Sequence, residues 1–356
     1  MGNEKSGFRP VGSGVPQGSI LGPLLFVLFI NDLPSGLSEE TEIHLYADDT
    51  KIWRAIDSNN DITCLQNDIN ILNNWANNNL MKFHPDKCKV LTVHNSHHIF
   101  HGVDGKTVFS PYTLDSHPLK SVDVEKDLGV DITPKLNWEH QVTRLCSKAA
   151  QKLGLLRRSC FFVNDTSRAR TLYLTLVRSL FESCAVIWRP TNVALISKLE
   201  GIQKRGVKWI LNEENLSYSS SEIYIRKCKE INILPMSQRL ILTDLVLLHK
   251  VINGLVPLSL PTYLTLFSGK SRLRFCKLDK LSLVSSIIPV TKASKATTNN
   301  TFASSFFYRS HLLWNDLPFD LRSIECPLKF KSSLKSHLWS INDNQITHSN
   351  TDSDDE

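Results

Sequence analysis

The sequence lacks the features that mark several classes of protein. Its eight cysteines form no Cys-x-x-Cys pair, which argues against a zinc knuckle or a redox pair and favours free thiols in a reducing compartment. Residues 1–10 are polar, so no secretory signal is evident. The longest apolar run, residues 20–30, contains Gly22 and Pro23 and is too short to cross a bilayer. We therefore expect an intracellular protein, in the nucleus or the cytoplasm, without membrane contact.

Positive charge is concentrated in one part of the chain. The formal net charge is only +6, yet residues 135–210 contain 14 lysines and arginines against 4 aspartates and glutamates. Such a concentration favours a polyanionic partner, such as a nucleic acid, although a solvated helix surface is an equally simple interpretation. The basic residues that we expect on the outer faces of helices, as nucleic-acid contacts, are Arg144, Lys148, Lys152, Arg157, Arg158, Lys204, Arg205 and Lys208.

Helix and strand patterns predict an α+β protein with a mixed N-terminal part and a helical remainder. The patterns predict a helix over residues 21–33, strands over 42–46 and 50–55, and an amphipathic helix from residue 57 or 58 to about 80. The regions that we expect are residues 1–96 for the mixed part, 97–134 for connecting strands and loops, 135–265 for a basic helical region, 266–305 for a basic Ser/Thr-rich linker, 306–340 for an aromatic segment, and 341–356 for a disordered acidic tail.

Two adjacent carboxylates, Asp48 and Asp49, are expected at the turn between the two predicted strands. Adjacent carboxylates repel each other, and a bound cation relieves that repulsion. Carboxylate oxygens are also the usual protein ligands of Mg²⁺. The turn is therefore a candidate metal site, although an isolated Asp-Asp pair is more often a solvent-facing hairpin turn.

A glycine-containing loop comes immediately before the first predicted helix. Gly14 and Gly18 allow the backbone to approach a substrate closely, Pro16 stiffens the loop, and Gln17 offers both a donor and an acceptor. The N-terminus of the helix that follows favours a phosphate group. Alone, the loop would be an ordinary turn before a core helix. The order of loop, helix, strand, carboxylate pair, strand and amphipathic helix is what makes it informative.

Two motifs in this order resemble those of a known family. They are Ser13-Gly14-Val15-Pro16-Gln17-Gly18-Ser19-Ile20-Leu21-Gly22-Pro23-Leu24-Leu25-Phe26 and Tyr46-Ala47-Asp48-Asp49. They resemble the second palm motif and the metal-binding hairpin of the reverse transcriptases of non-LTR (LINE-type, jockey-like) retrotransposons. Later segments around residues 75–91, 126–130 and 313–318 look like later parts of these polymerases, so the resemblance covers nearly the whole chain.

The resemblance implies a fold and an activity. The fold would be a partial polymerase palm, an antiparallel sheet with helices on one face, followed by a mainly helical thumb-like and C-terminal region. The activity would be that of an RNA-directed DNA polymerase, a nucleotidyltransferase that adds deoxynucleoside triphosphates to a DNA primer on an RNA template. Such polymerases use two divalent metal ions, here Mg²⁺ with Mn²⁺ as a possible substitute.

The resemblance also implies residue roles. Asp48 would be the main metal ligand and Asp49 would assist it, while Lys87 would act on the leaving pyrophosphate. Tyr46 and Ala47 would lie under the primer end. The residues that would contact the template and the incoming nucleotide are Gly14, Pro16, Gln17 and Gly18.

One element of the family pattern is missing from the sequence. The first palm motif of the family carries another essential aspartate upstream of the glycine loop, but only 13 residues precede Gly14 and none of them is an aspartate. We therefore expect a C-terminal portion of the polymerase, with an uncovered apolar face, that is inactive by itself. The alternative is a non-catalytic protein, derived from the element, that binds nucleic acid or serves as an interaction scaffold. The oligomeric state stays open.

Overall fold

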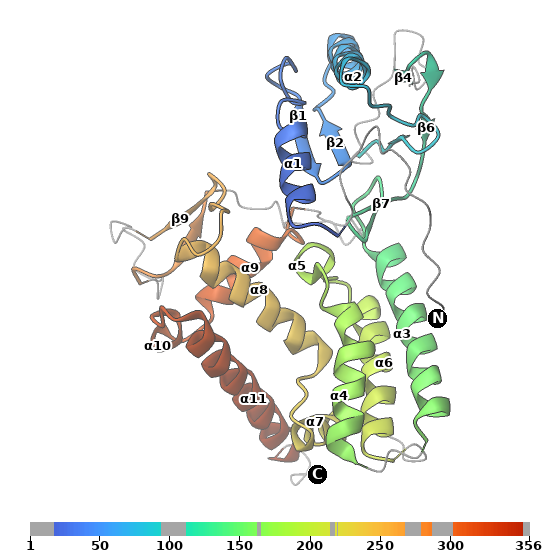
Figure 1. The fold of residues 1–356 in the computed structure, drawn as a ribbon. Coiled ribbons are helices and arrows are strands. Elements are labelled where there is room, and N and C mark those ends of the chain that lie inside the picture. The colour runs from blue at the N-terminus through green and yellow to red at the C-terminus, as the bar shows by residue number, and fades with distance from the viewer. Residues whose placement is uncertain are drawn as a thin grey trace, which may run out of the picture. The chain divides into compact units, whose positions relative to one another are not determined.

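The computed structural model describes residues 18–93, 112–161, 165–213, 218, 220–267, 279–286 and 302–351, with only the backbone from residue 343 onward. The chain divides into two compact units, residues 1–123 and 124–356. Helices and small two-stranded sheets occur together, which is compatible with the α+β class (Figure 1). The division falls inside residues 97–134, which we expected to connect two regions; the finer domain boundaries stay predictions.

The first unit contains two helices and three two-stranded sheets. Strands β1 and β2 form an antiparallel hairpin, as do β4 and β5, whereas β3 and β6 pair in parallel. The parallel pair departs from the antiparallel sheet that we expected, because a long connection separates its two strands. The elements are α1 (Leu21–Ile30), β1 (Glu42–Tyr46), β2 (Asp49–Trp53), α2 (Asn59–Asn78), β3 (Lys89–Val90), β4 (Thr113–Leu114), β5 (His117–Pro118) and β6 (Lys120–Ser121).

A small core joins the β1–β2 hairpin to helices α1 and α2. Ile30, Leu33 and Leu72 are its buried centre, and the inward side chains of the two strands pack against them. Strand alternation leaves the other side chains of the hairpin exposed on the opposite face. Helix α2 has the predicted amphipathic pattern and begins at the predicted cap, Ser58, but Leu80 lies beyond its end and is exposed.

Helix α1 buries fewer side chains than its apolar sequence suggests. It ends at Ile30 rather than at residue 33, and only Gly22 and Ile30 within it are buried. Leu24, Leu25 and Leu28, which we expected to form a core stripe, are 59%, 52% and 74% exposed. They lie on the sides of the helix that face away from the core, so the described part of the unit has an uncovered apolar face.

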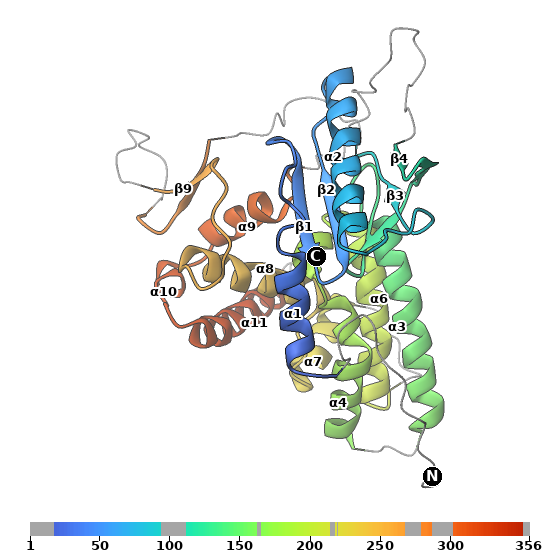
Figure 2. The ribbon, with the colours of Figure 1, turned by 45° about the horizontal axis from the view of Figure 1, so that its top comes forward.

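The second unit is mainly helical. Figures 1 and 2 show α3, α4 and α6 side by side, and α8 packed against α9 and α11. Its elements are β7 (Glu125–Asp127), β8 (Val130–Ile132), α3 (Glu139–Ser159), α4 (Thr166–Leu176), the 3₁₀ helix η1 (Arg178–Phe181), α5 (Ala185–Trp188), α6 (Val193–Ile210), α7 (Ser221–Glu230), α8 (Met236–Ile252), β9 (Leu264–Leu266), β10 (Leu283–Ser285), α9 (Phe306–Asn315), α10 (Phe319–Arg322) and α11 (Pro327–Thr351).

Two features of this unit bear on the sequence predictions. Helix α11 continues to Thr351, through much of the tail for which we expected disorder. Every helix in the described ranges is either too short or too polar to cross a membrane.

Two apolar cores stabilise the second unit. One lies among α3, α4, η1 and α6, and the other among α8, α9 and α11. Trp188 is fully buried in the first core and donates its indole N–H to the carbonyl of Ser183 at 2.8 Å. Trp138 and Trp209 are partly buried against the same core. These tryptophans are therefore packing residues rather than exposed platforms for bases.

Gly206 allows helices α4 and α6 to approach each other closely. A Cβ atom at this position would lie 2.2 Å from Cε2 of Tyr173, whose ring is fully buried. Gly201 lies on the same helix, and a Cβ there would meet no atom of the described residues within 4 Å. The two glycines thus differ in packing while sharing one helix.

We predict that Gly206→Ala lowers the free energy of unfolding by about 1–3 kcal/mol, because the added methyl group displaces a fully buried ring. The matched control, Gly201→Ala, should raise it by up to about 1 kcal/mol through better helix propensity. Urea unfolding followed by circular dichroism measures both. A Gly206→Ala protein as stable as the Gly201→Ala protein would contradict this packing.

Candidate functional site

The carboxylate pair lies at the tip of the β1–β2 hairpin. Tyr46 pairs with Asp49 at the end of the ladder, which leaves Ala47 and Asp48 as a two-residue turn. Ala47 has a φ of +53°, in the left-handed region that costs a residue other than glycine about 1–2 kcal/mol. Tyr46, Ala47, Asp48 and Asp49 are all exposed. The turn thus presents both carboxylates to solvent on a strained but defined backbone.

Asp48 lines a small hollow between the hairpin and the helices of the first unit. The hollow has a volume of about 30 Å³, and Asp48 shares its wall with Thr50, Trp75 and Phe83. The hydroxyl of Thr50 is buried and has no hydrogen-bond partner among the described residues. Because buried hydroxyl groups are normally hydrogen-bonded, a water molecule or a ligand oxygen is the expected partner. The hollow can hold a group of that size, but it is far too small for a nucleotide.

The lysine beside Asp48 is Lys82, which sequence analysis did not single out. Lys82 lines the hollow, whereas Lys87 lies in the exposed turn that follows, with its backbone N–H donating to the carbonyl of His84 at 2.9 Å. Thr50 was also missed, although strand alternation from Asp49 predicts an inward side chain there. The position of Lys82 depends on how α2 packs against the hairpin, which no local pattern reveals.

The two carboxylates offer donor atoms that fit a magnesium ion. Within the described ranges, no group of three or more His, Cys, Asp and Glu side chains is placed to hold a metal. Mg²⁺ is often held by one or two carboxylates and takes its remaining oxygens from water and substrate phosphates. Asp48 and Asp49 therefore match part of such a site, which groups from elsewhere would have to complete.

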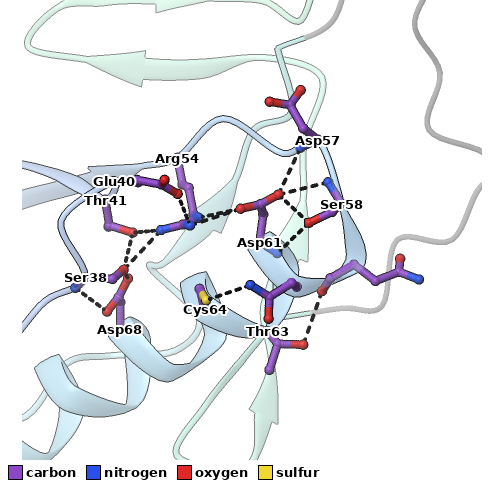
Figure 3. A network of polar contacts seen from close by, with 12 residues as sticks. Ser38, Glu40, Thr41, Arg54, Asp57, Ser58, Asp61, Thr63, Cys64 and Asp68 are labelled. Atoms are coloured by element: carbon purple, nitrogen blue, oxygen red, sulfur yellow. Dashed lines mark hydrogen bonds and ion pairs between the residues drawn. The ribbon is translucent and has the colours of Figure 1, made fainter.

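A polar network centred on Arg54 anchors the hairpin (Figure 3). Arg54 follows β2, and its side chain is only 5% exposed. Its Nε and Nη2 atoms donate to Oδ1 of Asp61, at 3.2 and 3.0 Å. Its Nη1 atom donates to the hydroxyl groups of Ser38 and Thr41, at 3.1 and 3.3 Å, and Nη2 also pairs with Glu40. One guanidinium thereby joins the end of β2, the start of α2 and the loop before β1.

Two aspartates of α2 complete this network. Asp61 forms a capping box with Ser58, whose backbone N–H donates to Oδ2 of Asp61 at 2.9 Å. Hydrogen bonds from Ser58 and from Arg54 lower the pKa of Asp61 to about 2. Asp68 is buried and accepts hydrogen bonds from the backbone N–H and the hydroxyl of Ser38, at 3.0 and 2.5 Å. The network therefore places the hairpin relative to α2 through several charged contacts.

Trp75 and the start of α1 supply further contacts. The ring of Trp75 meets the ring of Phe29 edge-on with centroids 5.8 Å apart, and its indole N–H donates to Oδ1 of Asp32 at 3.0 Å. Gly18, just before α1, has a φ of +81°, which explains the glycine by backbone conformation. The other residues of the predicted loop contacts, Gly14, Pro16 and Gln17, lie outside the described residues.

Some of the predicted basic contacts are exposed on the second unit. Lys148, Lys152 and Arg158 are exposed on α3, and Arg205 is exposed on α6, the helix that packs against α3. Arg157 is half-buried. The exposed members are available to a polyanion in the described structure.

Other predicted basic contacts already have partners within the unit. Arg144 donates from Nε to Oδ2 of the buried Asp131 at 2.5 Å, and from Nη2 to the carbonyl of Gly129 at 2.9 Å. The ammonium groups of Lys204 and Lys208 each lie 5.1 Å from the centre of a tyrosine ring, that of Tyr224 and that of Tyr218 respectively. Arg144 therefore holds the β7–β8 hairpin on α3, and the two lysines help to position α7 and the segment before it.

The chain is similar to known proteins, chiefly in its N-terminal part. Residues 1–142 match the family model for reverse transcriptase (RNA-dependent DNA polymerase). The chain is 29% identical over 148 residues to the RNA-directed DNA polymerase from mobile element jockey of Drosophila melanogaster, which is 40% of this chain and 15% of that protein. The corresponding protein of Drosophila funebris is 30% identical over 154 residues, again 40% of this chain and 15% of the relative.

A longer match extends into the second unit. The chain is 24% identical over 220 residues to the probable RNA-directed DNA polymerase from transposon X-element of Drosophila melanogaster, which is 58% of this chain and 23% of that protein. No solved structure matches the chain. The chain thus spans less than a quarter of the length of these curated relatives.

Residues 1–142, which include the Asp48 hairpin, are therefore reverse transcriptase sequence. The curated relatives show that it is of the non-LTR, jockey-like kind, and this confirms the resemblance drawn from the glycine loop and the Tyr46–Asp49 motif.

We predict a characteristic pH dependence for the Arg54 network. A carboxylate whose pKa is lowered on folding stabilises the fold above its unfolded pKa, and that stabilisation is lost as the pH falls through the folded pKa. For Asp61 this window runs from its ordinary value of 3.8 down to about 2. Asp61→Asn should therefore be less stable than the parent protein at pH 7, and the difference should shrink between pH 4 and pH 2.

Urea unfolding at several pH values measures this difference. Asp57→Asn is the matched control, because it removes a neighbouring exposed carboxylate and leaves the contacts between Asp61 and Arg54 in place. An Asp61→Asn effect that stays constant from pH 7 to pH 2 would show that the charge of Asp61 contributes nothing.

Proposed function

We propose that the first unit is part of the palm of an RNA-directed DNA polymerase, with Asp48 as its main metal ligand and Asp49 as an assisting one. The observation that supports this most directly is the position of Asp48, at the tip of an anchored hairpin and on the wall of a hollow that contains an unpaired buried hydroxyl. The reverse transcriptase match over the same residues supports it independently. In such polymerases, divalent ions stabilise the attacking 3′ oxygen and the leaving pyrophosphate.

The residues around the carboxylates have separate roles in this proposal. Tyr46 is 67% exposed beside the turn and offers its ring to the end of a DNA primer. Lys82 contributes positive charge to the hollow that Asp48 lines. Lys87, in the exposed turn beyond it, is proposed to meet the phosphates of the incoming deoxynucleoside triphosphate. Template RNA and these substrates occur in the nucleus and the cytoplasm, where we place the protein.

The exposed basic residues of α3 and α6 are proposed to bind the phosphates of the primer–template. Lys148 and Lys152 are four residues apart on one helix, so their side chains lie on the same face. Lysine and arginine contacts of this kind recognise the backbone and carry little sequence preference. The bound nucleic acid would then be selected by its charge rather than by its base sequence.

We propose that the 356-residue polypeptide binds a primer–template without extending it. Asp48 and Asp49 are two carboxylates, and the described residues place no third metal-binding side chain beside them. An incomplete ligand set reduces the rate by orders of magnitude. This holds for these 356 residues by themselves, whatever precedes them in a longer polypeptide. Binding of nucleic acid without catalysis is then the activity that remains.

Binding of Mn²⁺, followed by electron paramagnetic resonance, tests the role of Asp48. We expect weak binding by the parent protein and loss of that binding in Asp48→Asn, because the main carboxylate donor is gone. Asp57→Asn removes an equal charge from an exposed position outside the hairpin and should bind like the parent. Unchanged binding by Asp48→Asn would contradict the assignment.

The salt dependence of binding tests the basic face. Each phosphate contact contributes about 0.9 to the slope of log K against log salt for a duplex. We therefore expect Lys148→Gln/Lys152→Gln to reduce the slope for an RNA–DNA hybrid by about 2. The control, Lys280→Gln/Lys329→Gln, removes two exposed charges outside α3 and α6. Equal slopes for the two double variants would mean that binding does not use this face.

A further inference from the structure

A second hollow, within residues 124–356, gathers positive charge from several elements. It has a volume of about 230 Å³ and lies among α4, η1, the turn between α7 and α8, α8 and α11. Among the described residues that line it, four cations face a single carboxylate; the cations are Arg170, Arg178, Arg239 and Lys335, and the carboxylate is Glu182. The charged groups of the wall therefore carry an excess of three positive charges.

The carboxylate is already occupied. Glu182 accepts from Nε of Arg239 at 2.9 Å and from Nη2 of Arg239 at 2.6 Å, a bidentate pair. Its Oε1 atom is also 3.4 Å from Nε of Arg178. Since a bidentate pair uses both oxygens of the carboxylate, Glu182 balances essentially one guanidinium. The remaining cations of the hollow need another anion.

Arg178 gives a second, independent indication of an absent anion. It is 3% exposed, and its Nε atom has no hydrogen-bond partner among the described residues. Burial lowers the pKa of Arg178, as expected for a guanidinium that is removed from water without full compensation. Buried polar groups in folded proteins almost always have a partner, and a buried charge needs one most.

The other cations are held in place around Arg178. Arg170 donates from Nε to the carbonyl of Ile231 at 2.7 Å, and Lys335 donates from Nζ to Oδ1 of Asn232 at 2.6 Å. Burial lowers the pKa of Lys335, and the positive charges of Arg170, Arg239 and Arg178 lower it further. The cations are thus close enough to repel one another, and an anion between them would turn this repulsion into attraction.

We propose that this hollow binds a phosphate group, with Arg170, Arg178 and Lys335 as its cationic contacts. Guanidinium groups match the oxygens of a phosphate in charge and geometry, and a lysine adds a point charge. The volume of about 230 Å³ accommodates a phosphate and part of an attached nucleoside. Two sources share this chemistry: a phosphate of a nucleic-acid backbone, and a free phosphate or pyrophosphate.

Binding of inorganic phosphate to the 356-residue protein, followed by ³¹P NMR or by calorimetry at constant ionic strength, tests the proposal. We expect Lys335→Gln to weaken phosphate binding about tenfold or more, the effect of losing one charge-assisted contact. The control is Lys329→Gln, which removes the same charge from an exposed position on the same helix, outside the hollow. It should bind phosphate like the parent protein.

Thermal unfolding provides a readout that does not depend on a variant. Phosphate should raise the unfolding temperature of the parent protein more than chloride does at equal ionic strength, and Lys335→Gln should reduce this gain. Absence of phosphate binding at millimolar concentrations, or equal affinity of Lys335→Gln and Lys329→Gln, would overturn the proposal. In that case the cations would serve only to join the helices.

Competition identifies the source of the phosphate. If an RNA–DNA hybrid displaces bound phosphate and itself binds Lys335→Gln more weakly, the occupant is a backbone phosphate. If pyrophosphate displaces it and the hybrid does not, the occupant is a free anion. Either result supports a phosphate site, and neither depends on the metal-binding role of Asp48.

Discussion

The guanidinium of Arg54 is the contact on which the position of the carboxylate pair depends. A two-stranded hairpin is marginally stable by itself, and β1 and β2 pair only with each other. Arg54 lies where β2 ends, and it joins that end to Asp61 on α2 and to Ser38 before β1. Because its side chain is almost fully buried, water cannot take over these contacts. The anchored end fixes the hairpin, and the hairpin carries Asp48 at its tip.

Much of this region could be predicted from local sequence. Alternating apolar residues predicted β1 and β2, and the 3.6-residue period with Ser58 as cap predicted α2. Both signals are local, because each depends on neighbours within one or two turns. The buried hydroxyl of Thr50 and the neighbourhood of Lys82 could not be predicted with the same certainty, since they arise where α2 packs against the hairpin. Helix α1 shows the converse, because its apolar sequence predicted burial that the described fold does not provide.

The basic region shows a similar division between local and tertiary information. Charge density identified residues 135–210, and Lys148 and Lys152 are exposed there as expected. It did not reveal that Arg144 is paired with the buried Asp131. Nor did it reveal the hollow at Arg178, because Lys335 comes from a helix far along the chain. Counting charges finds a basic segment, whereas the balance of each charge with its neighbours shows where an anion is still needed.

The account assigns to the hairpin part of a metal site that groups from elsewhere complete. Primer extension by the 356-residue protein on an RNA template with Mg²⁺ tests this most directly, together with binding of the same primer–template. The account predicts salt-sensitive binding and no extension, because the described residues supply the carboxylates of Asp48 and Asp49 without a third ligand. Extension that is abolished by Asp48→Asn would contradict it, since these residues alone would then form a complete catalytic site.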